Sequence, residues 1–77
     1  MLRLLLMKYF FSIRMSIDEF MPYYEGRAST IIVITDQGLK VQFPAMHLRK
    51  YITRQGIIGN FCLETHNNKF LSLTKLK

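Results

Sequence analysis

The chain has 77 residues, of which 49% are hydrophobic and 21% are charged, and its formal net charge at pH 7 is +6. This composition excludes a disordered chain, and the length leaves room for one domain only. A single cysteine, Cys62, excludes an internal disulfide and favours a reducing compartment, so we expect a cytoplasmic protein.

The N-terminal stretch MLRLLLMK contains a short apolar run. The run is too short for a signal peptide, and the cations around it exclude a membrane span of about 20 apolar residues. We interpret residues 1–7 as an N-terminal extension, which is either disordered or a mis-assigned start close to Met7. Residues 8–77 are then a single domain.

A strand followed by a helix is predicted for the first third of the domain. Apolar residues alternate from Lys8 to Met15, which indicates a half-buried strand. Ser16 and Glu19 form a capping-box pattern at a helix start, and Gly26 is suited to its end. Pro22 removes a helical hydrogen bond at a cost of about 3 kcal/mol, so we expect a kink or a short, irregular helix. The buried face of this helix is expected to hold Ile17, Phe20, Met21 and Tyr24.

A β-hairpin is predicted next. Residues 29–35, STIIVIT, are rich in β-branched residues and apolar on both faces, which indicates a central strand. Residues 36–38 turn the chain, with Gly38 suited to a left-handed conformation. Residues 39–43 return as a strand whose inward side chains are expected to be Leu39, Val41 and Phe43.

A second helix and a last hairpin complete the chain. Pro44 suits the first turn of a helix, whose outward residues include Arg49 and Lys50. Residues 57–65 and 69–76 predict a hairpin around Asn67 and Asn68, with a bulge or bend at Gly59. The buried face of the second helix is expected to comprise Ala45, Leu48, Tyr51 and Ile52.

The predicted order is β-α-β-β-α-β-β, which indicates an α+β fold with an antiparallel sheet of about five strands. Two short helices cover one face of this sheet. The other face has too many apolar residues for an ordinary solvent-exposed face and too many polar residues for a core. Either the sheet curls into a partial barrel, or this face meets a partner. That face is expected to carry Phe10, Ser12, Arg14, Lys40, Gln42, Asn60, Cys62, Glu64 and two apolar residues of the central strand.

The charge of the chain is strongly uneven. Four cations and four acidic residues balance one another up to Gly38, whereas seven cations face only Glu64 from Leu39 onward. The whole net charge of +6 therefore belongs to the second half. This asymmetry favours an anionic partner without identifying it.

The chain resembles a family of short bacterial proteins, the domain of unknown function 2835, in YFFSIRMSIDEFMPYYEG, GLKVQFPAMHLRKYIT, QGIIGNFCLE and NNKFLSLTKL. The most specific part is VQFPAMHLRKYIT followed by GIIGNF. The resemblance extends from Lys8 to Leu76 and implies a single cytoplasmic domain, with no established activity or cofactor and no assigned catalytic residues. The chain departs from the family pattern at two positions. It has Pro22 where we expect an ordinary helix former, and it has Lys50 where the family often has proline.

The sequence offers little for catalysis or metal binding. His47, Cys62 and His66 fall on three different predicted elements, which does not suggest a metal site. No serine has a sharp glycine-flanked turn around it, and the four glycines are isolated, so neither a nucleophile elbow nor a phosphate-binding loop is present. We therefore predict a protein that is not an enzyme, with no cofactor and no small-molecule substrate.

Nucleic-acid binding is the favoured hypothesis. Arginine and lysine side chains of the second half can contact the phosphates of RNA or DNA. The alternative is that these side chains form the ordinary solvent-exposed face of the second helix. The candidate residues for nucleic-acid binding are Lys40, His47, Arg49, Lys50 and Arg54.

A protein-binding module is the second hypothesis. A small domain with a mixed apolar sheet face is typical of a homodimer or of a subunit that binds another protein. Tyr23 and Arg27, near the end of the first helix, are the candidate contact residues, because tyrosine and arginine are enriched in interfaces.

Overall fold

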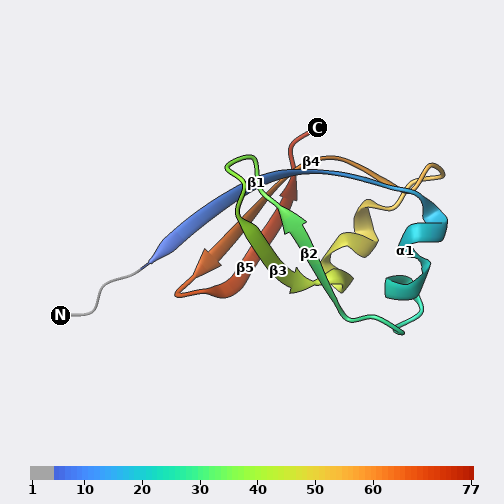
Figure 1. Cartoon of the computed structure of the whole chain (residues 1–77), viewed down its shortest axis with the longest axis horizontal. Helices are drawn as coiled ribbons and strands as arrows, with labels where there is room; N and C mark the ends of the chain where they lie inside the picture. The colour runs from blue at the N-terminus through green and yellow to red at the C-terminus, as the bar shows by residue number, and fades with distance from the viewer. Residues whose placement is uncertain (1–4) are drawn as a thin grey trace.

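The computed structural model of the chain describes residues 5–77 (Figure 1). It confirms the predicted α+β class and the order of the elements. The second helix is a 3₁₀ helix, labelled η1. The elements are β1 (Leu6–Met15), α1 (Ile17–Tyr24), β2 (Thr30–Ile34), β3 (Lys40–Pro44), η1 (Ala45–Tyr51), β4 (Ile57–His66) and β5 (Lys69–Lys75).

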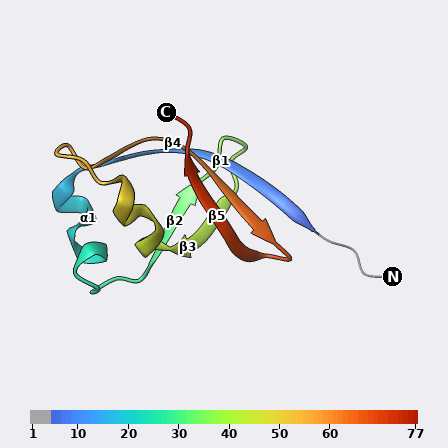
Figure 2. The ribbon, with the colours of Figure 1, turned by 180° about the vertical axis from the view of Figure 1, so that it is seen from behind.

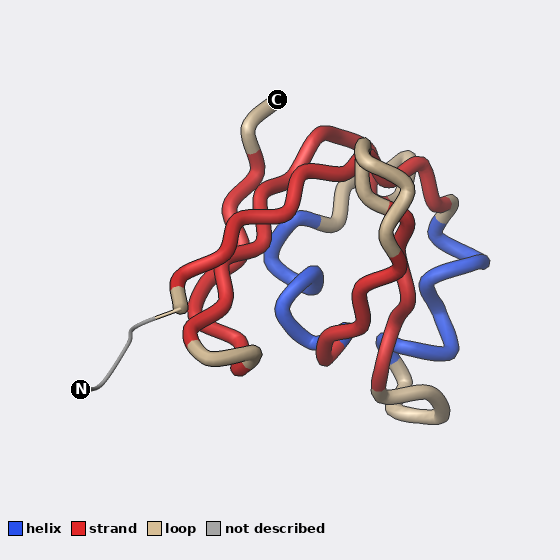
Figure 3. The backbone as a smooth tube through the Cα atoms, turned by 60° about the vertical axis from the view of Figure 1, so that its left-hand side comes forward, coloured by secondary structure: helices blue, strands red, loops and turns tan. Residues whose placement is uncertain are grey.

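The five strands form two antiparallel sheets instead of the single sheet that we expected. One sheet has the order β1-β4-β5, and the other is the β2-β3 hairpin. The long β1–β4 pair arches over the two helices and the hairpin (Figure 1 and Figure 3). Seen from behind, η1 lies between α1 and β5 (Figure 2). Within residues 5–77 the sheets do not join into a closed barrel.

The strand β1 begins two residues before the predicted one. It pairs with β4 along its whole length, from Leu6 opposite His66 to Met15 opposite Ile57. Leu6 and Met7, which we assigned to the N-terminal extension, therefore belong to the sheet. Residues 1–4 of that extension lie outside the described residues.

The predicted capping box of α1 is confirmed. The Glu19 amide donates to the Ser16 hydroxyl at 3.1 Å, and the Ser16 amide donates to the Glu19 carboxylate at 2.9 Å. Pro22 lies inside a helix of only eight residues, in agreement with the expected short helix. Gly26 follows the end of the helix with φ +82°, a left-handed conformation that glycine adopts without strain.

Both predicted hairpin turns are present. Gly38 has φ +84°, and the Thr35 amide closes the loop by donating to the Leu39 carbonyl at 2.7 Å. Asn67 and Asn68 have φ values of 52° and 67°, as a two-residue turn of this hand requires. These turns depend on local residues, which explains why their positions follow from the sequence.

The 3₁₀ geometry of η1 accounts for its buried positions. Ala45 and Leu48 are buried and Tyr51 is partly buried, so the inward residues recur every three positions. A 3₁₀ helix has three residues per turn, which places residues three apart on one face. Pro44 precedes the helix as the last residue of β3, and Ile52 follows it.

One prediction about a strand and two about individual residues are wrong, and of the two alternatives given for Gly59 the bulge is absent. The strand β2 is not central, because β3 is its one neighbour among the strands of residues 5–77. Leu39 is exposed instead of inward, and Tyr24 is exposed instead of buried on α1. The ladder is regular at Gly59, which pairs with Ile13, and the β-bulge lies further along β4, after Glu64.

Every helix and strand contributes to one core between the two sheets. Phe11 lies at its centre, with ring centroids 5.8 Å from Phe43 and 6.0 Å from Phe61. The outer face is largely as predicted, except that Cys62 is buried and Glu64 partly buried. The core residues are Phe11, Ile13, Phe20, Ile31, Val33, Phe43, Ala45, Leu48, Ile57, Phe61, Leu63 and Leu73.

Candidate anion-binding surface

The helix η1 presents two cations to solvent because its opposite side is anchored in the core. Leu48 has no exposed surface, and the two residues that follow it, Arg49 and Lys50, are exposed. The predicted outward orientation of these two side chains is therefore present in the structure.

Three residues of η1 each lie against an aromatic ring. The guanidinium carbon of Arg49 is 4.4 Å from the centroid of the Tyr24 ring, and the Lys50 ammonium is 5.2 Å from that of Tyr51. The His47 ring stacks on Phe70 with a centroid distance of 3.7 Å and an interplanar angle of 6°. Such contacts hold cationic side chains on the surface without removing their charge.

A hydrogen bond fixes η1 against the edge of the larger sheet. The Tyr51 hydroxyl donates to the Leu73 carbonyl of β5 at 2.9 Å. The same tyrosine ring packs edge-on against Phe61, with centroids 5.4 Å apart. Tyr51 therefore holds the position of the helix relative to β5.

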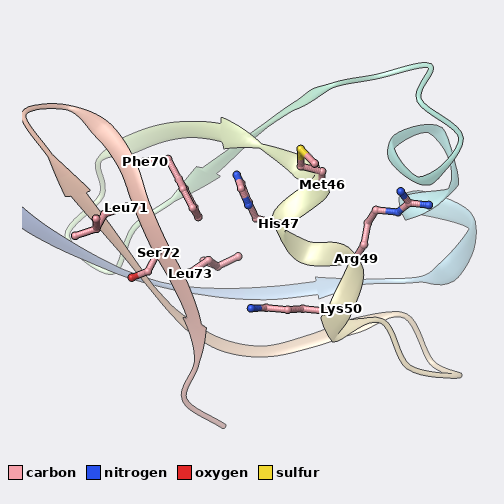
Figure 4. Close-up of a pocket in the computed structure, with 8 residues that line it drawn as sticks. All are labelled: Met46, His47, Arg49, Lys50, Phe70, Leu71, Ser72 and Leu73. Atoms are coloured by element: carbon pink, nitrogen blue, oxygen red, sulfur yellow. The ribbon is translucent and has the colours of Figure 1, made fainter.

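An open groove of about 430 Å³ runs between η1 and β5. In Figure 4 the His47 and Phe70 rings lie next to each other between η1 and β5, while Arg49 extends toward α1 and Lys50 extends the other way, toward β5. We call His47, Arg49, Lys50 and Phe70 the η1–β5 surface. The full lining comprises Met46, His47, Arg49, Lys50, Phe70, Leu71, Ser72 and Leu73.

The structure brings together three of the five predicted nucleic-acid-binding residues. His47, Arg49 and Lys50 line the groove. Lys40 is the first residue of β3, whose far end leads into η1, so about 13 Å of strand separates it from the helix. Arg54 lies in the turn after η1, which packs against the junction of β1 and α1.

The acidic residues of the first half do not neutralise this surface. Within residues 5–77 the single ion pair joins Arg27 to Glu25 at 2.7 Å. Neither Arg49 nor Lys50 has a carboxylate partner in the described part of the chain, so their charges remain available to an anion. Arg27, a candidate contact residue for a protein partner, already has a partner in its own chain.

The other candidate contact residue, Tyr23, is half-buried. Its ring packs on Phe20 with centroids 5.8 Å apart. The neighbouring Tyr24 is exposed, and the Arg49 side chain lies over its ring. We missed this role of Tyr24, because a helical pattern does not show which short helix will lie beside α1.

The thiol of Cys62 is shielded from solvent. The side chain is buried in β4, and burial raises the pKa of the thiol, with a further contribution from the charge of Glu64. A higher pKa leaves less thiolate at neutral pH. Within residues 5–77 no three His, Cys, Asp or Glu side chains gather into a group that could hold a metal ion.

Comparison with known proteins supports the predicted family resemblance. The model of a family described as "Protein of unknown function (DUF2835)" matches residues 7–76. No curated protein and no solved structure matches the chain. No helix in the described part of the chain has the length and apolar character needed to cross a membrane.

Proposed function

The chain belongs to the DUF2835 family, whose function is unknown, and from that premise we propose that it binds single-stranded RNA or DNA through the η1–β5 surface. The protein then acts as a binding module and not as an enzyme. The observation that carries this proposal is that Arg49 and Lys50, which have no ion-pair partner among the described residues, line one groove and each lie against an aromatic ring.

The chemistry of the groove suits a single strand. Arg49 and Lys50 supply positive charge for phosphates, and the stacked pair of His47 and Phe70 supplies flat rings beside them. Proteins that bind single strands combine a positive groove with aromatic side chains on which bases stack. The bases of a duplex stack on one another, so a duplex would contact the cations through its phosphates and would not stack on the aromatic rings.

The expected affinity is low and depends on salt. Two phosphate contacts to a single strand give a logarithmic salt slope of about −1.4, so affinity falls about sevenfold between 50 and 200 mM salt. The positive charge of the whole second half adds a weaker, less specific attraction.

Charge reversal tests the proposal. The double variant Arg49→Glu, Lys50→Glu is compared with the wild-type chain by fluorescence anisotropy, using labelled 20-nucleotide RNA and DNA strands at 50 mM salt. We expect the affinity to fall at least tenfold. A matched control, Lys8→Glu with Lys40→Glu, makes the same change of net charge away from the groove and should have a much smaller effect.

The salt dependence gives a second readout. The negative slope of log affinity against log salt should become shallower in the Arg49, Lys50 variant and stay nearly constant in the control. Equal losses in both double variants would show that net charge alone drives binding, which contradicts a defined surface. No measurable binding by the wild-type chain at 50 mM salt would also refute the proposal.

A further inference from the structure

We propose that the groove between β1 and β2 binds an extended peptide segment of a partner protein, which adds a strand to the open edges of both sheets. This site is separate from the η1–β5 surface and does not depend on nucleic-acid binding. The groove has a volume of about 360 Å³. Its lining comprises Ser12, Ile13, Arg14, Met15, Glu19, Tyr23 and residues 31–34.

The edge of β2 that faces the groove carries unpaired backbone groups. The Thr35 amide donates to the Leu39 carbonyl, which shows that residue 35 directs its backbone toward the β3 side. Because this direction alternates along an antiparallel strand, Thr30, Ile32 and Ile34 direct their N–H and C=O groups away from β3.

The facing edge of β1 has the same property. The Phe10 carbonyl accepts a hydrogen bond from the Asp36 amide at 2.8 Å, so Phe10 directs its backbone away from β4. By alternation Ser12 and Arg14 do the same. In the described part of the chain, the bond between Asp36 and Phe10 is the one backbone hydrogen bond that joins these two edges. Beyond it no backbone hydrogen bond joins the two sheets within residues 5–77, although their side chains share the core.

Two facing rows of free N–H and C=O groups match the backbone of an extended peptide. A peptide strand presents alternating donors and acceptors on both of its edges, so it can pair with β1 and β2 at once. Addition of a strand to an exposed sheet edge is a common mode of peptide recognition. The strand β2 carries no charged residue that would discourage such pairing.

The side chains around the groove define the partner further. Ile13, Ile31 and Val33 lie on the core side, so inward side chains of the peptide should be apolar. Ile32 and Ile34 are 61% and 54% exposed on the outer side, which favours apolar contacts there as well.

Charge complementarity adds an acidic position to the peptide. Arg14 is exposed and has no ion-pair partner within the described residues, whereas the Glu19 carboxylate accepts the Ser16 amide. The free charge at the groove is therefore positive. A peptide residue beside Arg14 should carry a carboxylate.

A single peptide strand fits this groove better than a second copy of the chain. The groove has β2 on one side and β1 with α1 on the other, so a bound segment would lie between two sheet edges. A second copy would approach with its own β1 lying along the same edge of its β2. We therefore assign the groove to a segment from a different protein.

Amide hydrogen exchange of the full chain, followed by NMR, tests whether the edges are open. The amides of Ile32 and Ile34 should exchange at least 100-fold faster than those of Ile31 and Val33, which face β3. Equal protection of all four would mean that β1 and β2 already pair in solution, and the proposal would be wrong.

A peptide selection tests which kind of peptide binds in the groove. A phage-displayed library of random nine-residue peptides is selected on the full chain, and the enriched peptide is synthesised and titrated by NMR. We expect apolar residues at alternate positions with one acidic residue, and slower exchange of the Ile32, Ile34, Ser12 and Arg14 amides. If no peptide is enriched, or if the shifts lie elsewhere, the proposal fails.

Matched variants complete the test. Arg14→Glu should weaken binding of the selected peptide at least tenfold, while Lys69→Glu, an equal charge reversal at an exposed residue of β5 outside the groove lining, should leave it nearly unchanged. Equal effects would refute a specific contact at Arg14. If the same amides shift when the peptide-free protein is concentrated, the groove binds a second copy, which contradicts our assignment.

Discussion

The strands β4 and β2 both contain runs of apolar residues, yet they occupy different places in the fold. β4 pairs with β1 on one side and with β5 on the other, and its successive residues Phe61, Cys62 and Leu63 are all buried. β2 pairs with β3 alone, and its residues alternate between buried and exposed. An apolar stretch therefore indicates that a strand can be buried on both faces, but it does not determine how many neighbours the strand has.

The largest expected difference between these strands is in the free energy of unfolding that a buried side chain contributes. Phe61 on β4 is 1% exposed and lies between the rings of Phe11 and Tyr51. Phe61→Ala should lower the free energy of unfolding by about 3–5 kcal/mol. Ile32→Ala on the outer face of β2 should change it by less than about 0.5 kcal/mol. Urea denaturation followed by circular dichroism measures both values.

The two variants together test the exposed face of β2. A large loss for Ile32→Ala would mean that the face is covered in solution, against the exposure seen in the structure. A small loss for Phe61→Ala would mean that β4 is not the centre of the core. For a domain of this size, a loss of about 4 kcal/mol removes much of the total stability.

Local features of the fold could be predicted from the sequence. The Ser16–Glu19 capping box and the turns at Gly38 and at Asn67 depend on residues close together in the chain. The outward direction of Arg49 and Lys50 also followed from local periodicity, because the buried Leu48 fixes the face of the helix.

Long-range features could not be predicted. The separation of the strands into two sheets depends on which edges meet, and β2 carries no residue that excludes a second neighbour. For the same reason the sequence did not separate Lys40 from Arg49, since their distance depends on the direction of β3. The contact between Arg49 and Tyr24 joins two helices that are distant in the chain.

The glycines beside these strands provide a second, smaller contrast. Gly56 immediately precedes β4 with φ +107°, and a methyl group there would collide with the backbone of Met15 and Ser16. Gly38 follows β2 with φ +84°, and a methyl group there would meet no atom. Gly56→Ala should cost about 2–4 kcal/mol, and Gly38→Ala about 1–2 kcal/mol from backbone strain alone.

Thermal unfolding of both glycine variants checks this contrast. If Gly38→Ala were the more damaging change, the turn after β2 would be held more tightly than the structure shows. Equal losses of stability in the two variants would indicate that backbone strain dominates at Gly56, and not the close approach of Gly56 to the β1–α1 junction.

The smallest expected effect concerns α1, which borders the open edge of β2. Hydrogen bonds from the Ser16 backbone and side chain lower the pKa of the Glu19 carboxyl below its ordinary value of 4.5. A lowered pKa means that folding favours the ionised form, so this contribution to stability is present at neutral pH and is lost as pH falls through the folded-state pKa.

In Glu19→Gln the amide keeps a capping interaction without titrating. The stability of the wild-type chain should therefore fall more steeply between pH 5 and pH 3 than that of the variant, as measured by urea denaturation at each pH. A parallel decline of the two chains would show that the Glu19 carboxylate does not stabilise the start of α1.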